Sequence, residues 1–245
     1  SRSGAVCRRL IPPTEASPCC TRVIDHCSSL RNLCPCAVRW PAANCDPHPM
    51  LQVFVTSLSG CLISVQRRVD DSTRFDRSWA EYAAGFGPGP HSNHWIGLRS
   101  LNSLTWPSGR QLLIRMRLWN DTEYWANYSS FSVDSEDNKF QASISGFSGS
   151  SGLGDCMAIC SGMKFSTFDS DNDIFPGSCS ASFKGGWWYG LCHCTNPNGL
   201  YFYPPTALNT TDYAKSVCWS KSVWLLLFDE GVRDAGPLRT KKFLA

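Results

Sequence analysis

The alternation of apolar and polar residues in the middle of the chain predicts β-strands, because successive side chains of a strand point to opposite faces. The stretches that favour a strand are 62–69, 110–119 and 124–133. Helix-forming residues over 76–82 predict a short helix, with Asp76 as its N-cap and with Gly85 and Gly87 ending it. Segment 94–98 fits either a short helix or a short strand.

The chain changes character after residue 145, where Gly, Ser, Asp, Asn and Pro dominate and are interleaved with Trp and Tyr. Regular structure should thin out there. Long irregular loops usually serve a metal, a set of disulfides or a binding surface. Strands and short helices in the middle, followed by such loops, predict an α+β fold with an antiparallel sheet.

The composition supports a folded core and limits the classes of partner. Hydrophobic residues make up 42% of the 245 residues and charged residues 18%, which argues against disorder. The net charge of +3 is too small to require nucleic acid or a membrane as partner. The longest strongly apolar run, 223–228, is far shorter than the roughly 20 residues of a membrane span. No signal peptide opens the sequence, so the signal of a secreted form has been removed or is not included in it.

Cysteine is the most informative residue type. Of the fourteen cysteines, eight lie before residue 62 and six after residue 155. So many thiols favour an oxidising, extracellular compartment, and three N-glycosylation sequons agree with it. The sequon asparagines are Asn120, Asn127 and Asn209. The cysteine spacings lack the paired CxxC pattern of a structural zinc site, so further disulfides are favoured, and Cys156 could bridge Cys160 one helical turn away.

Three alternating carboxylates form the first candidate site, at Asp169, Asp171 and Asp173. Several oxygens that converge in a turn suit a hard cation such as calcium. The EF-hand pattern does not fit, because its glycine would fall at Ile174 and its last glutamate at Ser180. A solvated turn in which the aspartates cap local backbone groups explains the same spacing, so both interpretations stay open.

Cys179 and Cys192 enclose an aromatic loop, and His193 follows directly. A disulfide between the two cysteines would close this loop beside the acidic turn. An enzyme would use Cys192 and His193 as nucleophile and base, but adjacent residues rarely face one another, and a thiol is poorly preserved outside the cell. The sequence also lacks a catalytic triad, paired carboxylates and a cofactor motif, so we predict that the protein is not an enzyme.

Several motifs of the chain resemble, in sequence, order and spacing, those of the fibrinogen C-terminal (fibrinogen-related) domain. The first half of the resemblance lies at 66–70, 79–82, 85–87, 94–98 and 128–131. The second half lies at 162–169, 171–173, 179, 186–189, 192–193 and 198–201. Within that family the stretch 193–201 is most similar to the ficolins and to microfibril-associated glycoprotein 4. The resemblance implies the fold of that domain, with a loop-rich subdomain that binds calcium and ligand.

The resemblance also implies the division of the chain and part of its disulfide pattern. It divides the chain into a divergent cysteine-rich segment, 1–44, a fibrinogen-like domain, 45–230, and a basic tail, 231–245. A disulfide that the family has in the loop region matches Cys179–Cys192. Cys45 corresponds to an earlier family cysteine, with Cys19 or Cys20 as its partner by distance along the chain.

The calcium site and the ligand pocket are carried over residue by residue. Side chains of Asp171 and Asp173, with backbone carbonyls of Phe175 and Gly177, would bind Ca²⁺. The ligand pocket would lie beside the ion, at a Leu191–Cys192 peptide that is often cis in relatives. The other pocket residues are Phe183, His193, Tyr213, Ala214 and, with a shift of one residue, Trp224.

The pocket chemistry predicts a neutral ligand. Fibrinogen chains have acidic residues at the positions of Phe183 and Ala214, where they hold a cationic peptide terminus, and both charges are absent here. An apolar pocket with one histidine and one tyrosine suits the methyl group of an N-acetyl sugar. The alternative is that Tyr213 and Trp224 are core aromatics.

The departures from the family concern its ends and its extra cysteines. The closing strand is barely recognisable and 224–228 could replace it, while Cys194 and Cys218 flank the pocket in sequence and are predicted to pair. We expect a secreted, calcium-dependent lectin for acetylated sugars or glycans, with innate recognition as its role. An extracellular-matrix or receptor-binding adhesion protein with a vestigial sugar pocket is the alternative. Useful affinity would require an oligomer, for which intermolecular disulfides are one means.

Overall fold

A computed structural model of the chain describes residues 50–203, 214–220 and 225–226. Its main sheet is antiparallel, and its six strands follow the order β3-β2-β1-β4-β5-β6. These strands are β1 (Met50–Thr56), β2 (Leu62–Arg68), β3 (His94–Trp95), β4 (Arg110–Arg117), β5 (Glu123–Val133) and β6 (Ala142–Gly149). The helices are α1 (Trp79–Ala84), α2 (Leu98–Thr105) and α3 (Cys179–Phe183), with 3₁₀ turns η1 (Glu136–Asn138) and η2 (Ala158–Cys160). A small second sheet pairs β7 (Cys218–Trp219) with β8 (Leu225–Leu226).

The three predicted strands are confirmed as β2, β4 and β5, and the α+β class is confirmed with them. Segment 94–98 contains both of its alternatives, because β3 ends at Trp95 and α2 begins at Leu98. Strands β1 and β6 were not predicted, and the Ser- and Gly-rich sequence of β6 resembles a loop. Strand β8 falls inside the 224–228 segment proposed for the closing strand.

The predicted start of the first helix was wrong. Ser78, not Asp76, is the N-cap of α1, and its hydroxyl accepts a hydrogen bond from the Glu81 amide while the Glu81 carboxylate accepts one from the Ser78 amide. This reciprocal capping box satisfies two amides that the helix itself leaves without partners. The end was predicted correctly, since Gly85 caps α1 with a φ of 97°.

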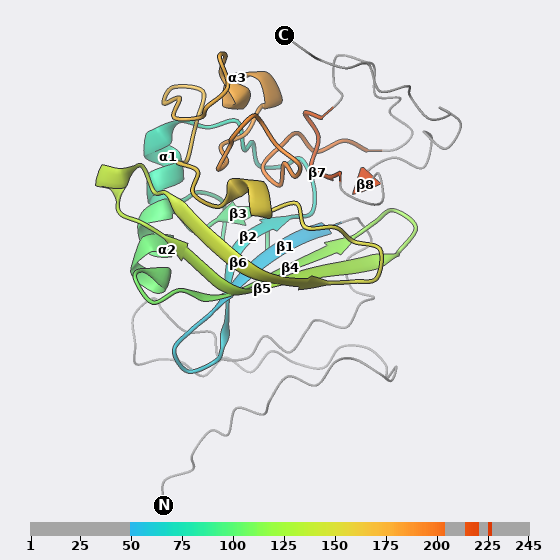
Figure 1. Cartoon of the computed structure of the whole chain (residues 1–245). Coiled ribbons are helices and arrows are strands. Elements are labelled where there is room, and N and C mark those ends of the chain that lie inside the picture. The colour runs from blue at the N-terminus through green and yellow to red at the C-terminus, as the bar shows by residue number, and fades with distance from the viewer. Residues whose placement is uncertain (1–49, 204–213, 221–224, 227–245) are drawn as a thin grey trace, which may run out of the picture.

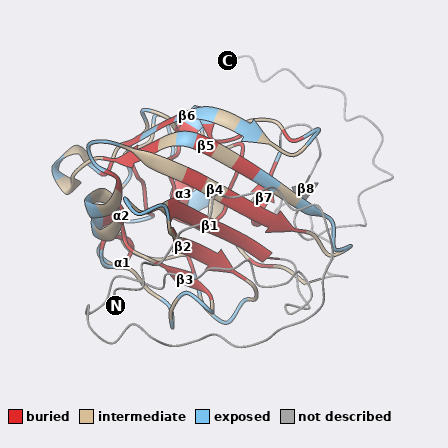
Figure 2. Ribbon diagram, turned by 90° about the horizontal axis from the view of Figure 1, so that it is seen from below, coloured by how far each residue is buried: buried red, intermediate tan, exposed pale blue. Residues whose placement is uncertain are grey.

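The core lies between the sheet and the loops that follow it. The central strands β1 and β4 are largely buried (Figure 2). Trp188 lies at the centre of an aromatic cluster, with its ring 5.1 Å from that of Phe165 and 5.8 Å from that of Phe131. Its indole N–H donates to the carbonyl of Phe140 at 2.8 Å. The aromatic loop between Cys179 and Cys192 is therefore core-forming and does not present its tryptophans to a ligand.

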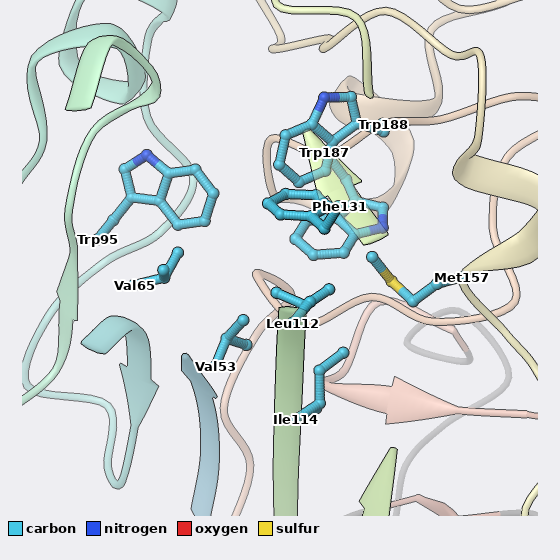
Figure 3. Close-up of a pocket in the computed structure, with 9 residues that line it drawn as sticks. All are labelled: Val53, Val65, Trp95, Leu112, Ile114, Phe131, Met157, Trp187 and Trp188. Atoms are coloured by element: carbon cyan, nitrogen blue, oxygen red, sulfur yellow. The ribbon is translucent and has the colours of Figure 1, made fainter. Parts of the chain in front are cut away.

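A small cavity remains where this loop meets the sheet (Figure 3). It has a volume of about 10 Å³ and is lined by apolar side chains. The lining residues are Val53, Val65, Trp95, Leu112, Ile114, Phe131, Met157, Trp187 and Trp188. A space of this size holds about one water molecule, and a water needs polar partners that this lining lacks, so the cavity is a packing defect and not a ligand site.

Two side chains of β2 tie the sheet to the loop-rich region, which lies above the sheet in Figure 1. Gln66 donates to the carbonyl of Pro197 at 3.0 Å, and Arg68 donates to Pro197 and Gly199 carbonyls at 3.1 and 2.8 Å. Burial lowers the pKa of Arg68 to about 10, and its guanidinium lies 4.0 Å from the ring centroid of Phe75. These contacts place the turn 196–199 directly over the sheet. None of the helices in the described part of the chain could span a bilayer.

Candidate functional site

Hydrogen bonds of Asp169 and Asn172 fix the first half of the acidic turn to the rest of the fold. Asp169 accepts hydrogen bonds from the Thr167 hydroxyl at 2.7 Å and from the Trp79 amide at 2.9 Å. The Asn172 side chain donates to the Phe165 carbonyl at 2.9 Å. Asp169 therefore fixes the turn to the start of α1, which leaves the other two aspartates as the cation-binding candidates.

Asp173 organises the second half of the turn. Its two oxygens accept from the amides of Phe175 and Cys179, both at 2.9 Å, and its own amide donates to Asp171 at 3.2 Å. Burial raises the pKa of the Asp173 carboxyl, and the neighbouring charge of Asp171 adds to that shift. Two coupled carboxylates are costly to ionise together without a counter-charge.

This donor set fits a calcium ion. Each carboxylate oxygen that accepts one backbone hydrogen bond keeps a second lone pair for a cation. Within the described ranges, no three acidic, histidine or cysteine side chains converge on a metal position. Backbone carbonyls would therefore have to complete the shell, as they do for oxygen-preferring calcium, and Phe175 and Gly177 were predicted to supply them. The assignment of calcium to these residues remains a prediction.

The structure pairs Cys179 with Cys192, which joins the first residue of α3 to the loop before His193. Ser178 caps α3 by accepting from the Ala181 amide at 3.2 Å. Because the Asp173 carboxylate binds the Cys179 amide, the acidic turn, the helix and the disulfide form one connected unit.

Two predicted cysteine pairings were wrong. Cys194 forms a disulfide with Cys156. This pairing excludes both the predicted Cys194–Cys218 bond and the Cys156–Cys160 bond. Strand β7 sets Cys218 opposite Asn196, whose amide donates to the Cys218 carbonyl at 3.0 Å. Cys160 is turned into the core by η2. Burial raises the pKa of the Cys160 and Cys218 thiols to about 12, so these two are unreactive at neutral pH.

Three of the predicted pocket residues lie close together. The rings of Phe183 and His193 meet edge to face with centroids 4.6 Å apart. The side-chain amide of Asn196 donates to the carbonyls of Phe183 and Ala214, at 3.0 and 3.3 Å, so Ala214 borders the same space. Leu191, the predicted pocket residue two positions before His193, is 74% exposed.

The expected cis peptide at Leu191–Cys192 was wrong. Within the described residues the cis bond is Trp106–Pro107, and the loop instead turns at Cys192, which has a φ of 64°. Several predictions lie outside the described residues. They concern Tyr213, Trp224, Asn209, Cys45 with its possible partners Cys19 and Cys20, the segment 1–44 and the tail 231–245.

His193 is the polar side chain among the predicted pocket residues that the structure describes. In the described part of the chain, neither of its buried ring nitrogens has a hydrogen-bond partner of good geometry. The Ala214 backbone lies close enough to raise the pKa of His193 slightly, against the larger, lowering effect of burial. Burial lowers the pKa of His193 to about 4. The imidazole is therefore neutral at physiological pH, with one N–H donor and one acceptor nitrogen.

The depressed pKa of His193 predicts how stability depends on pH. Above about pH 6.5 the imidazole is neutral in both folded and unfolded chains. As the pH falls from there to about 4, the unfolded chain takes up the proton first, so stability is lost by at most about 1.4 kcal/mol per pH unit. Urea midpoints of wild type and His193→Gln across this range would measure it. Parallel pH profiles for the two proteins would contradict the prediction.

The two described sequons differ in their setting. Asn120 is exposed in the turn between β4 and β5, where its side chain accepts from the Thr122 amide at 3.0 Å. Asn127 is half-buried within β5, and its amide donates to the Ser148 hydroxyl at 3.4 Å. Glycosylation at either asparagine remains a prediction.

Sequence reasoning missed Asn196, whose side-chain amide binds the backbone of two predicted pocket residues, Phe183 and Ala214. The signal for it was its place in an Asn-Pro-Asn-Gly turn that begins three residues after His193. Its neighbour Asn198 donates to the Gly186 carbonyl at 2.8 Å and accepts from Gln66, which ties the turn to the sheet.

Residues 45–225 match the family of C-terminal globular domains of the fibrinogen beta and gamma chains. Angiopoietin-4 from Bos taurus is 36% identical over 138 residues, which cover 56% of this chain and 27% of that protein. Ryncolin-4 from Cerberus rynchops is 37% identical over 154 residues, which cover 63% of this chain and 43% of that protein. The chain thus spans less than half the length of these relatives.

Solved structures give the same fold. The fibrinogen-like globe domain of human ANGPTL6 superposes with a TM-score of 0.61 at 30% identity, covering 70% of this chain and 72% of that one. Lamprey fibrin D-dimer, complexed with the peptide Gly-His-Arg-Pro-amide, superposes with a TM-score of 0.62 at 25% identity, covering 78% of this chain and 69% of that one.

Proposed function

This chain belongs to the family of fibrinogen C-terminal globular domains, and on that premise we propose that it is an extracellular, calcium-dependent recognition domain for the acetamido group of N-acetylated sugars. The two disulfides in the described region agree with an oxidising compartment. Phe183, His193 and Ala214 would contact the ligand, and Tyr213 and Trp224 would complete the pocket.

The neutral imidazole of His193 carries this proposal, because the described part of the chain gives its ring nitrogens no hydrogen bond of good geometry. A buried polar group without a partner costs free energy, and a ligand that supplies one recovers it. An acetamide has one N–H donor and one carbonyl acceptor, either of which matches a neutral imidazole, and its methyl group can pack on the ring of Phe183.

Charge disfavours the other ligand class, a peptide with a cationic amino terminus. Lamprey fibrin D-dimer holds such a peptide. Here Phe183 and Ala214 are uncharged, and the residues that follow them are both cations, Lys184 and Lys215. An ammonium group would lose its water without gaining a counter-charge, whereas a neutral acetamide has no such cost.

Calcium, when bound, would neutralise Asp171 and Asp173 and draw backbone carbonyls around itself. The Asp173 carboxylate would then accept from the Cys179 amide, and the Asp171 carboxylate from the Asp173 amide, with less repulsion between the two carboxylates. Because Cys179 is joined to Cys192, an ordered acidic turn would hold the loop that presents His193.

A second candidate is protein recognition on the same face. Ile174 and Phe175 in the acidic turn are 62% and 46% exposed, and Leu191 is also exposed. Large apolar side chains that gather on one surface commonly mark a protein interface. This candidate would make the domain an adhesion or receptor-binding module.

Retention on a column of immobilised N-acetylglucosamine, in calcium and in chelator, separates the two candidates. We expect retention in calcium, elution by free N-acetylglucosamine, and loss of retention in His193→Ala. A matched Ile174→Ser variant should be retained as wild type is. No retention of wild type, or retention that depends on Ile174 and not on His193, would contradict the sugar proposal.

A further inference from the structure

The buried side chain of Asn196 lies where the separate parts of the candidate pocket meet. Asn196 is fully buried, and its amide nitrogen faces three backbone carbonyls: Phe183 at 3.0 Å, Ala214 at 3.3 Å and Lys215 at 3.4 Å. Its oxygen accepts from the hydroxyl of Tyr189 at 3.2 Å. One side chain thus connects the end of α3, the 214–215 segment and the core.

Each of these partners belongs to a wall of the pocket or supports one. Phe183 is the last residue of α3 and packs on His193. Ala214 has a φ of 63°, a conformation that residues with a side chain rarely adopt unless their surroundings enforce it. The hydrogen bond from Asn196 to the Ala214 carbonyl is one such constraint.

The space around the Asn196 amide is itself built for it. A Cβ atom on Gly199 would lie 2.6 Å from the Asn196 amide nitrogen and 2.4 Å from the Lys215 carbonyl oxygen. Only glycine at this position leaves room for the side chain of Asn196 to reach between the two segments. The backbone of Asn196 is also fixed, since the Asn196 amide donates to the Cys218 carbonyl of β7.

From this geometry we infer that Asn196 is a positioning residue, which sets the distance between Phe183 and Ala214 and so determines the affinity for the acetamido ligand. The identity of the ligand in this inference rests on the proposed function. The effect of Asn196 on the positions of Phe183 and Ala214 does not. Asn196 acts through its two N–H groups, because only a donor can hold carbonyls on opposite sides together.

Asn196→Asp tests this with almost no change of shape. At pH 7.5 its carboxylate would face three carbonyl oxygens and could donate to none of them, so we expect N-acetylglucosamine to bind at least about tenfold more weakly. At pH 5.5, protonation of this buried carboxyl restores one donor, and affinity should recover toward that of wild type.

Asn198→Asp is the matched control, because Asn198 lies two residues away, is equally buried and donates to Gly186, outside the pocket. It should lower the melting temperature without an acid-dependent recovery of affinity. If Asn196→Asp does not fold, Asn196→Ser serves instead: a hydroxyl donates to one carbonyl at most, so binding should weaken at every pH between 5.5 and 7.5.

A readout without ligand separates this inference from the proposed function. The imidazole protons of His193, assigned by their loss in His193→Gln, should be shifted by the ring current of Phe183. We expect that shift to shrink in Asn196→Asp at pH 7.5, to return at pH 5.5, and to persist in Asn198→Asp. An unchanged shift in Asn196→Asp, or an equal change in both variants, would overturn the inference. Failure of wild type to bind the sugar would refute only the proposed function.

Discussion

Replacing Cys179 and Cys192 together by serine should lower the free energy of unfolding by about 3 kcal/mol. The bond closes a loop with a sequence separation of 13, and without it the unfolded chain regains the entropy that this loop had lost. The variant should also bind N-acetylglucosamine poorly, because α3 and the His193 loop are no longer joined. Denaturant unfolding under nonreducing conditions, followed by the same titration, would measure both effects.

The second disulfide provides the control for this result. Cys156–Cys194 has a sequence separation of 38, so its removal by Cys156→Ser and Cys194→Ser should cost more, about 4 kcal/mol. Equal stability of the Cys179→Ser, Cys192→Ser protein and wild type would contradict the account. Recovery of Cys192 as a free thiol in peptide mapping of the wild type would contradict it as well.

Calcium should stabilise the wild-type domain, and Asp173→Ala should abolish that stabilisation. At a free calcium concentration of one hundred times the dissociation constant, binding to the folded state alone adds about 2.7 kcal/mol. Asp173→Ala removes one of the two carboxylates and releases the amides of Phe175 and Cys179. Thermal unfolding in calcium and in chelator would give the calcium-dependent increment for each protein.

Asp169→Ala is the matched control for this experiment, because Asp169 lies in the same turn but binds Trp79 and Thr167. It should be less stable than wild type in chelator yet keep the full calcium increment. Because burial raises the pKa of Asp173, calcium affinity should fall as the pH drops through that pKa. Absence of a calcium increment in wild type, or its loss in Asp169→Ala, would contradict the assignment.

Strands β2, β4 and β5 were predicted from their patterns, whereas β1 and β6 were not. β6 is Ser- and Gly-rich, and its stability comes from pairing with β5 and from Ser161, whose hydroxyl bonds both the amide and the carbonyl of Ile144. That contact joins residues 17 positions apart, so no local pattern contains it. The start of α1 was misplaced for the opposite reason, since the Ser78–Glu81 capping box is visible in the sequence but was passed over for Asp76.

The site was predicted in part because family motifs place its residues in order. The structure brings Phe183, His193 and Ala214 together, and it joins Cys179 to Cys192. The pairing of Cys194 could not be deduced, because several cysteines were available and only the packed loops decide which two approach. The role of Asn196 was hidden for a similar reason: its partners are backbone carbonyls, which carry no sequence signal.

The central claim is that the pocket selects a neutral acetamido group over a cationic peptide terminus. Calorimetric titration of the wild-type domain in calcium with N-acetylglucosamine, glucosamine and Gly-His-Arg-Pro-amide tests it most directly. We predict millimolar binding of N-acetylglucosamine, no measurable binding of glucosamine, whose ammonium group replaces the acetamide, and no measurable binding of the peptide. Tighter binding of the peptide than of N-acetylglucosamine would contradict the account, because it would require a negative charge that Phe183 and Ala214 do not supply.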